Sequence, residues 1–461
     1  MKNLNLSYYT ISVKLNSEPD KYLLVHGYTG AIDIVNEKIW EQMNNFSENH
    51  LLPPEIINLL VQRGYLTTKN KAEEVEHVTQ LAQTLHKVQK KLYKSFGFIV
   101  TYNCNFRCPY CFENIISKHG NNWGKQVFTK EMVDKAYEAM FKIEPRKELH
   151  TNKILLYGGE PLLSENKDIV SYILLKGAQL GYSFKIITNG YDIDHYIDVL
   201  DANYIYLIQI TIDGNREHHN SRRFHYIEGN SYDKILKNIG LLINKNINVV
   251  VRVNTDNNNI HDFNFLKDEF KALGYDKSSH LKIYSSFLRK FKDNLSVSQN
   301  IDYLPNIESL HRKSRKEYNE LIYCHDFNIA KDFYYYLVHK SRCKLYSASC
   351  TSQFGSYIFD SKGDIYTCTE IVGRKEHIIG SYLGDDIQWS EARNHWFEKN
   401  TSNSVGCKDC KYSLLCGGPC LARVPHTKSG FNSFYCSEYK KIFSLSVNKA
   451  YTAYKNNEPV Y

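Results

Sequence analysis

Short apolar runs alternate with amphipathic segments through the middle of this chain. Between the runs, apolar side chains recur every three or four residues, as in Met132, Ala136 and Met140, which is the spacing of a helix with one buried face. Strands that alternate with helices predict a parallel sheet with right-handed crossovers. The pattern therefore predicts an α/β fold, a partial (β/α)6 TIM-like barrel over residues 96–290 that is open on one side. Its six strands are expected at 96–101, 154–157, 184–188, 206–212, 248–254 and 281–287.

The pattern changes at both ends of this central domain. Residues 1–70 contain two alternating segments, two short helical segments and a final turn, which predict a small separate domain. A charged, heptad-like helix over 71–95 is expected to connect it to the barrel. The expected elements of the small domain are strands at 8–15 and 22–28, helices at 37–43 and 53–63, and a β wing at 64–67.

Residues 291–342 read as a helical bridge, with one helix around Leu310, Tyr318 and Leu321 and another over 333–338. From residue 343 to residue 461 the chain becomes short and turn-rich, with a hairpin expected over 354–367. A segment of this kind has too few apolar runs to form a core of its own. We therefore expect its folding to be coupled to metal binding.

Composition excludes several classes of partner. The chain has 461 residues, 42% of them hydrophobic, and its 58 basic and 50 acidic side chains leave a net charge of +8. The basic residues are scattered, which does not favour nucleic-acid binding. No stretch approaches twenty apolar residues without charges, so no membrane span is expected. The first residues carry no apolar export signal, which predicts a cytoplasmic protein working under reducing or anaerobic conditions.

Three cysteines, Cys104, Cys108 and Cys111, follow the first strand of the predicted barrel. Three thiolates at this spacing can hold three corners of a [4Fe-4S] cluster and leave the fourth iron open to a small molecule. A structural zinc knot is the alternative. Zinc normally completes its shell with a fourth Cys or His, and none lies nearby in the right register.

A second candidate segment directly follows the second strand and consists of Gly158, Gly159, Glu160 and Pro161. Glycines allow the backbone to approach a ligand closely, and Glu160 offers an acceptor for an ammonium group. This segment lies some fifty residues past the cysteine triplet, at the same end of the predicted sheet, so the two are expected to form one site.

The C-terminal region holds a second cysteine array. Disulfides would need an oxidising compartment. Paired zinc sites fit the tight run from Cys407 to Cys420 but explain neither the pair spaced around Gly363 nor the upstream triplet, so iron–sulfur binding is favoured. The array comprises Cys350, Cys368, Cys407, Cys410, Cys416, Cys420 and Cys436.

With these motifs the chain resembles the radical S-adenosylmethionine (SAM) enzymes that carry a C-terminal SPASM domain. The resemblance implies that Cys104, Cys108 and Cys111 hold the catalytic cluster and that SAM and three [4Fe-4S] clusters are the cofactors. The implied SAM contacts are Tyr110, Gly158, Gly159, Glu160, Pro161, Asn189, Thr211, Arg223, Arg252 and Asn254.

The SPASM resemblance also implies two auxiliary clusters and adds Cys343 as a ligand. The first cluster is then held by Cys343, Cys350, Cys368 and Cys420, and the second by Cys407, Cys410, Cys416 and Cys436; Cys324 is left over. Residues 1–70 resemble the winged-helix leader-recognition element of ribosomal-peptide maturases, which binds a leader peptide as an added strand. The alternative is a small packing domain that stabilises the barrel.

The function implied is that of a peptide maturase. Reductive cleavage of SAM yields a 5′-deoxyadenosyl radical, which abstracts a hydrogen from a ribosomally made precursor, and a cross-link, most simply a Cys thioether, is then installed. The implied partners are that precursor with its leader and a flavodoxin- or ferredoxin-type electron donor. Candidate substrate bases are Glu370 and Asp360.

Four other functions compete with thioether formation. A carbon–carbon cross-linking cyclase is the runner-up. An epimerase needs a thiol hydrogen donor, for which only Cys324 is spare. A sulfatase-maturing enzyme resembles the chain in its cysteines, but that family carries an Asp where Thr369 stands here. An iron–sulfur electron carrier or scaffold benefits from a cluster with all four corners ligated, so the vacant corner argues against this class.

Overall fold

The computed structural model describes residues 4–46, 51–111, 113, 123–288, 322–323, 328–422, 433–458 and 460. The predicted helix around Leu310, Tyr318 and Leu321 lies outside these residues, as does Cys324. None of the helices in the described ranges is long and apolar enough to cross a membrane.

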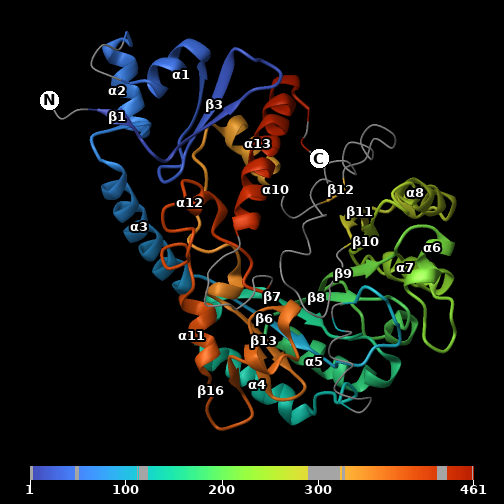
Figure 1. Cartoon of the computed structure of the whole chain (residues 1–461). Coiled ribbons are helices and arrows are strands. Elements are labelled where there is room, and N and C mark those ends of the chain that lie inside the picture. The colour runs from blue at the N-terminus through green and yellow to red at the C-terminus, as the bar shows by residue number, and fades with distance from the viewer. Residues whose placement is uncertain are drawn as a thin grey trace.

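The six predicted barrel strands are confirmed. They lie side by side in chain order and run parallel to one another. Four amphipathic helices follow one side of this curved sheet (Figure 1). The strands are β6 (Lys94–Ile99), β7 (His150–Tyr157), β8 (Ser183–Thr188), β9 (Ile205–Thr211), β10 (Val249–Thr255) and β11 (Leu281–Phe287), and the helices are α4 (Lys130–Ile143), α5 (Lys167–Gln179), α7 (Tyr232–Asn244) and α8 (Asp262–Ala272).

The sheet continues past both ends of the predicted barrel. At one end β12 (Ile322–Tyr323) pairs with β11. At the other, β13 (Ser356–Asp360) runs parallel to β6 and forms the predicted hairpin with β14 (Asp364–Tyr366). The turn residues predict the hairpin itself. They do not predict that it pairs with β6, because pairing between strands about 260 residues apart leaves no signal in the local sequence. Further out lie β15 (Gly380–Ser381) and β16 (Gln388–Trp389), which complete an 11-stranded sheet.

The N-terminal unit is a three-stranded antiparallel sheet with two helices. Both predicted strands and both predicted helices are present, and the expected wing forms a short strand that pairs with the start of the chain. The sheet order is β2-β3-β4. The elements are β1 (Asn5–Leu6), β2 (Thr10–Lys14), β3 (Lys21–His26), β4 (Ile32–Asn36), α1 (Glu37–Asn44), α2 (Pro54–Arg63) and β5 (Leu66–Thr67).

A long helix, α3 (Lys71–Lys91), runs from this unit toward the barrel (Figure 1). Its start is fixed by a capping box, in which the Asn70 side chain accepts from the backbone N–H of Glu73 while the Glu73 carboxylate accepts from that of Asn70. At its far end the buried His86 ring bonds the carbonyl oxygen of Phe397 at 2.7 Å. The helix is therefore tied to the C-terminal region as well as to the N-terminal unit.

The chain end closes back on the N-terminal unit. Helices α10 (Asn328–His339) and α13 (Ser433–Asn456) pack together, and Phe333 and Phe443 share an apolar cluster with Ile11 and Val13 of β2. Asn448 of α13 also bonds the backbone of residues 14 and 16. The N-terminal sheet is thus held by the last helix of the chain.

A buried histidine joins the N-terminal sheet to α3. The Nδ1 atom of His26 accepts from the backbone N–H of Thr29, and its Nε2 atom bonds the Ser7 hydroxyl, which in turn donates to Glu74 of α3. Protonation of Nδ1 would therefore break its hydrogen bond from the Thr29 N–H. Burial lowers the pKa of His26 from 6.5 to about 3.

This lowered pKa predicts an acid-labile contact. Below pH 6.5 His26 binds a proton in the unfolded chain but stays neutral in the folded chain. The contribution of the neutral, buried ring to the free energy of unfolding is therefore complete above pH 6.5 and is lost as pH falls toward 3. Between pH 7 and 5 we expect a loss of about 2 kcal/mol in the free energy of unfolding. Thermal unfolding should show that His26→Gln removes most of this pH dependence, while His195→Gln, at an exposed site, leaves it intact. Equal slopes for both variants would contradict the assignment.

Candidate functional site

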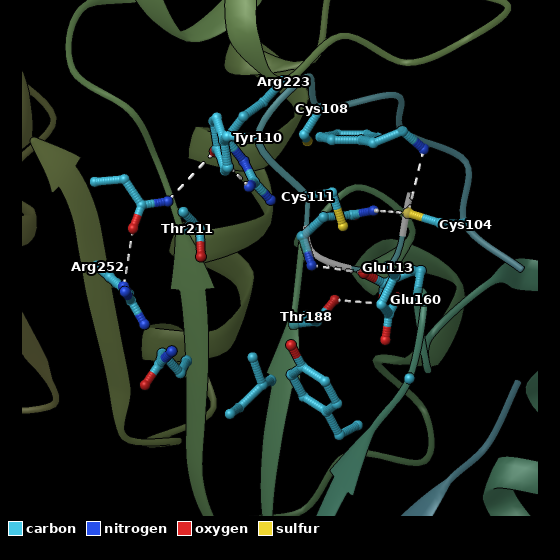
Figure 2. Close-up of a pocket in the computed structure, with 18 of the residues that line it drawn as sticks. Cys104, Cys108, Tyr110, Cys111, Glu113, Glu160, Thr188, Thr211, Arg223 and Arg252 are labelled. Atoms are coloured by element: carbon cyan, nitrogen blue, oxygen red, sulfur yellow. Dashed lines mark hydrogen bonds between the residues drawn. The ribbon is translucent and has the colours of Figure 1, made fainter. Parts of the chain in front are cut away.

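A cavity of about 290 Å³ lies at the carboxyl ends of the barrel strands, where parallel α/β folds place their chemistry. Its walls come from the ends of strands β7, β8, β9 and β10 and from the segments that follow β6, β7, β8 and β9. Figure 2 shows Arg252 and Thr211 across the cavity from Cys104 and Glu160. The cysteine loop and the Gly158–Glu160 segment therefore form one site, as their spacing predicts.

The three thiols of Cys104, Cys108 and Cys111 converge on this cavity. Burial raises the pKa of all three, that of Cys111 to about 12, and the charges of Cys108 and Cys111 raise the pKa of Cys104 further. Two N–H groups point at the Cys104 sulfur, from the backbone of Phe106 at 3.4 Å and from the Asn189 side chain at 4.0 Å. Buried sulfurs with N–H donors suit an iron–sulfur cluster, because the cluster would supply the positive charge that deprotonates them.

The glycines after β7 let the backbone pack directly against the start of the cysteine loop. A Cβ atom on Gly158 would lie 2.4 Å from the carbonyl oxygen of Thr101, and one on Gly159 would lie 2.3 Å from that of Asn103. The backbone N–H groups of Gly159 and Glu160 donate to the same two carbonyls at 2.9 and 2.8 Å. Glycine is required here because two backbone segments touch, and this contact sets Glu160 beside the thiols.

Glu160 is a buried carboxylate with a fixed orientation. It accepts hydrogen bonds from the Thr188 hydroxyl at 2.6 Å and from the backbone N–H groups of Asn189 and Leu162 at 2.6 and 2.9 Å. Burial raises its pKa to about 7 although these donors oppose the shift. A cationic ligand in the cavity would supply the missing counter-charge and keep the group ionised.

The facing wall carries a buried polar network around the Tyr110 hydroxyl. That hydroxyl donates to Asp213 and accepts from Arg223 at 3.0 Å and from Asn254 at 3.3 Å, while Arg252 donates to Asn254 at 3.0 Å. One Asp213 oxygen and the Arg223 Nε atom are buried without a partner among the described residues. Unpaired buried donors and acceptors are costly, so they fit a site that receives a polar, charged organic ligand.

The cavity gathers most of the residues that the sequence singled out. Tyr110, Gly158, Gly159, Glu160, Asn189, Thr211, Arg223, Arg252 and Asn254 line it, whereas Pro161 does not. Glu370 also lines it. Asp360 does not: its carboxylate accepts from the Tyr102 hydroxyl at 2.7 Å and from two backbone N–H groups of its own hairpin, so it holds the turn.

Sequence reasoning missed several lining residues. Tyr157, Thr188 and Gln209 stand on strands β7, β8 and β9, and an inward-facing alternation along each strand would have identified them. Glu113 also lines the cavity, two residues after Cys111, with a buried Oε1 atom that has no partner within the described chain. Its burial raises its pKa well above the usual value.

The C-terminal cysteines form two groups. Burial raises the pKa of the Cys368 thiol, and the charges of Cys420, Glu370 and Cys350 raise it further. Cys407, Cys410 and Cys416 line a second, smaller cavity with Tyr439 of α13. Cys436 belongs to α13, but its side chain lies outside the described residues.

Cys343 is the eighth cysteine that the resemblance implies as a ligand, and Tyr412 and Leu415 of the second cysteine run pack against its surroundings. It is buried in the apolar cluster between α10, α13 and the N-terminal sheet. Across the described ranges, no three His, Cys, Asp or Glu side chains gather closely enough to hold a single metal ion. A cubane cluster spaces its thiolates more widely than one ion does, so this finding bears on single-ion sites and not on clusters.

Comparisons with known proteins agree with this geometry. Residues 98–268 match the family model of the Radical SAM superfamily. A cysteine-type anaerobic sulfatase-maturating enzyme of Clostridium novyi is 23% identical over 75% of this chain and 93% of its own length. The radical SAM cyclopropyl synthase TigE of Paramaledivibacter caminithermalis is also 23% identical, over 92% of this chain and 90% of its own.

Two solved structures share the fold. Native anSMEcpe with bound AdoMet superimposes with a TM-score of 0.55 at 16% identity, over 79% of this chain and all of that one. Streptococcus suis SuiB bound to its precursor peptide SuiA gives a TM-score of 0.50 at 12% identity, over 93% of this chain and 98% of that one. The matched residues 98–268 contain both the cysteine triplet and the Gly158–Glu160 segment, so the chain carries a Radical SAM domain and is homologous to sulfatase and peptide maturases.

Proposed function

We propose that this enzyme matures a ribosomally made precursor peptide, abstracting a hydrogen from it and installing a cross-link, most simply a Cys thioether. The observation that carries this proposal is an unpaired strand edge on the N-terminal unit, which is the feature that a leader peptide needs for docking by strand addition. We propose that residues 1–70 are a winged-helix leader-recognition element.

The free edge is β4. The opposite edge, β2, is covered by α13, whose Asn448 side chain donates to the carbonyl of Lys14. On β4 no strand pairs with the outer side in the part of the chain that is described. The His26 N–H donates to the Ala31 carbonyl, so these two residues form a hydrogen-bonded pair of the β3–β4 hairpin. Because hydrogen-bonded and non-hydrogen-bonded pairs alternate along antiparallel strands, the N–H and C=O groups of Ile32 and Ile34 point away from β3. Arg63 occupies the Ile32 carbonyl at 2.8 Å, while the Ile34 side chain is 40% exposed.

The extent of the structural likenesses supports this role. SuiB with its bound precursor covers 93% of this chain and anSMEcpe covers 79%. The difference, 14% of 461 residues, is close to the size of the N-terminal unit. A sulfatase-maturing role would leave this unit without a purpose, and Thr369 stands where that family carries its Asp.

The cavity divides into a cofactor side and a substrate side. We propose that Glu160 binds the methionine ammonium of SAM and that Arg223 and Thr211 bind its carboxylate, while Tyr110 lies along the adenine. An iron–sulfur cluster on Cys104, Cys108 and Cys111 supplies, with SAM, the reductive step that begins hydrogen abstraction. Electrons come from a flavodoxin- or ferredoxin-type donor. Glu370, on the substrate side beside Tyr157, accepts a proton from the peptide.

We further propose that the C-terminal cysteines hold two auxiliary clusters in a SPASM domain, as the two separate thiol groups favour. A substrate thiol needs a soft ligand and an oxidant, and such clusters offer both. Cysteine substrates also occur among the relatives, one of which is a cysteine-type enzyme and another of which is solved with a Cp18Cys peptide. Carbon–carbon bond formation is the second candidate, favoured by the match to the cyclopropyl synthase TigE over 92% of this chain.

The product of the enzyme decides between these chemistries. We expect the short peptide encoded beside its gene, co-expressed with it, to lose about two hydrogens per cross-link, since each new bond replaces two bonds to hydrogen. Mass spectrometry after iodoacetamide treatment should show one fewer free thiol per link. Co-expression with a Cys104→Ala, Cys108→Ala and Cys111→Ala variant is the control and should give unmodified peptide. A lighter product with every thiol still free would indicate a carbon–carbon link, and an unchanged mass would contradict cross-linking altogether.

The docking edge can be tested by removing one N–H group. Ile34→Pro deletes a backbone donor that faces outward, where an edge strand tolerates proline, and should weaken binding of that precursor by at least about tenfold, the equivalent of one lost hydrogen bond. Ile34→Ala keeps the N–H and should bind within about threefold of the unchanged enzyme. Fluorescence anisotropy of the labelled precursor measures both. If the two variants bind alike, the leader docks elsewhere.

The role of Glu160 predicts a loss of cofactor affinity. Glu160→Gln removes a negative charge and turns an amide NH2 toward the donors from Thr188 and Asn189. A hydrogen bond to a charged group contributes about 1.5–3 kcal/mol, so SAM binding should weaken by roughly 10- to 150-fold. Isothermal titration of the reconstituted enzyme measures this, with Glu165→Gln at an exposed position as the control. An unchanged SAM affinity in Glu160→Gln would show that the ammonium group of SAM does not bind this carboxylate.

A further inference from the structure

We propose that His219 is a positioning residue for the cofactor side of the cavity. Its ring joins the backbone of Asp213 to that of Arg223, and the side chains of these two residues hold the Tyr110 hydroxyl. In this way the ring sets where the Arg223 guanidinium lies. The inference rests on the proposed function in one respect, that Arg223 binds the carboxylate of SAM.

His219 lies on α6 (Arg216–Arg222), and its side chain is fully buried. Burial and the charge of Arg223 lower its pKa well below the usual value, so the ring is neutral. Its Nδ1 atom accepts from the backbone N–H of Asp213 at 3.2 Å, so the single ring proton is on Nε2. Nε2 therefore donates to the Ser231 hydroxyl at 2.9 Å, and that hydroxyl donates to the carbonyl oxygen of Arg223 at 2.6 Å. Each of the three donors has its own acceptor, so the direction of this chain of bonds is fixed.

The Ser231 hydroxyl is available for this bond because another side chain serves its helix. Ser231 stands at the N-cap position of α7, where a serine normally accepts from the first turn, but its side chain makes no capping bond. The Asn220 side chain takes over part of this role, since its Oδ1 atom accepts from the backbone N–H groups of Ser231 and Tyr232 at 3.0 and 3.2 Å. Replacing the Ser231 hydroxyl would therefore not remove a helix cap.

The backbone of Arg223 is held on both sides. Its N–H donates to the carbonyl oxygen of His219 at 2.7 Å, and its own carbonyl accepts from Ser231. The carbonyl of the next residue, Phe224, accepts from the backbone N–H of Arg107 in the cysteine loop at 3.2 Å. A long side chain turns about several bonds, so it can be aimed only from a fixed backbone. His219 supplies that fixed backbone through its own carbonyl and through Ser231.

The side chains of the two joined residues meet again at Tyr110. Arg223 donates to the Tyr110 hydroxyl at 3.0 Å, and that hydroxyl donates to Asp213. A ring of hydrogen bonds therefore closes through His219 and Ser231. Figure 2 shows Arg223 beside Tyr110 at the cavity. An incoming carboxylate is bound best by donors that are already in place, and the ring provides this, because a shift of Arg223 would break bonds at both ends.

The test measures SAM affinity without any peptide. Ser231→Ala removes the bond to the Arg223 carbonyl and leaves every group that faces the cavity in place. Isothermal titration of the reconstituted enzyme should show SAM binding weakened about fivefold, the equivalent of one hydrogen bond. Ser221→Ala is the matched control, since it removes an exposed serine hydroxyl that bonds the carbonyl of His218 in the same helix, and should bind within about twofold. Unchanged SAM affinity in Ser231→Ala, even with a lower melting temperature, would overturn the proposal, because a merely structural role changes stability alone.

His219 itself can be replaced by phenylalanine, which keeps a ring but has no nitrogen. His219→Phe should weaken SAM binding by at least as much as Ser231→Ala, because both bonds of the ring are lost. Combining the two substitutions should weaken binding no further than His219→Phe alone, since both act in one chain of bonds. A His219→Phe enzyme that binds SAM as the unchanged enzyme does would overturn the proposal.

A double-mutant cycle asks whether this chain acts through Arg223. Arg223→Gln should weaken SAM binding by roughly 10- to 150-fold, as expected for a lost bond to a charged group. Adding Ser231→Ala should then change the affinity by less than about twofold, because the guanidinium to be positioned is gone. A further loss of about fivefold would overturn the proposal. Unchanged affinity in Arg223→Gln alone would instead contradict the carboxylate contact of the proposed function, and this inference with it, so the two failures are distinguishable.

Discussion

The contact on which the site depends is the one between two backbone segments, residues 101–103 at the end of β6 and Gly158–Gly159 at the end of β7. The two glycines let these chains approach within hydrogen-bond distance. One strand end carries the three thiols and the other carries Glu160, so a single contact sets the distance between these thiols and the carboxylate. Any side chain at Gly158 or Gly159 would push the two apart, and no flexible group is available to yield, since the opposing atoms are backbone.

A second constraint works over a longer range. The C-terminal helix α13 packs on β2 and covers one edge of the N-terminal sheet, while the backbone of Cys343 supports the β3–β4 turn. Helix α3 bonds the C-terminal region through His86. The N-terminal unit is therefore joined at three places to the part of the chain that carries the auxiliary cysteines, and β4 is left as its free edge. A peptide docked on β4 would be held at a set position relative to the cavity, which raises its effective concentration there.

Much of this arrangement follows from local sequence. The barrel strands were predictable because buried parallel strands read as continuous apolar runs, and the site followed because the motifs come directly after those runs. The place of β13 beside β6, the return of α13 to β2 and the location of Cys343 were not predictable, since each depends on contacts between residues hundreds of positions apart. Cys343 is one example: the resemblance makes it an expected ligand, but its position between α10, α13 and β2 follows only from the folded chain.

The division of the cavity explains how relatives with different products can share one fold. The groups around Glu160 and Tyr110, which we propose to bind the cofactor, have little conformational freedom because their hydrogen bonds are short and buried. Another part of the cavity wall is formed by Glu113, Tyr157, Thr369 and Glu370. Thr369 and Glu370 belong to the turn after Cys368, so a change in that turn would alter the cavity wall and the surroundings of Cys368 together. If the proposed function holds, a change of product could arise in this turn without disturbing the contact between β6 and β7.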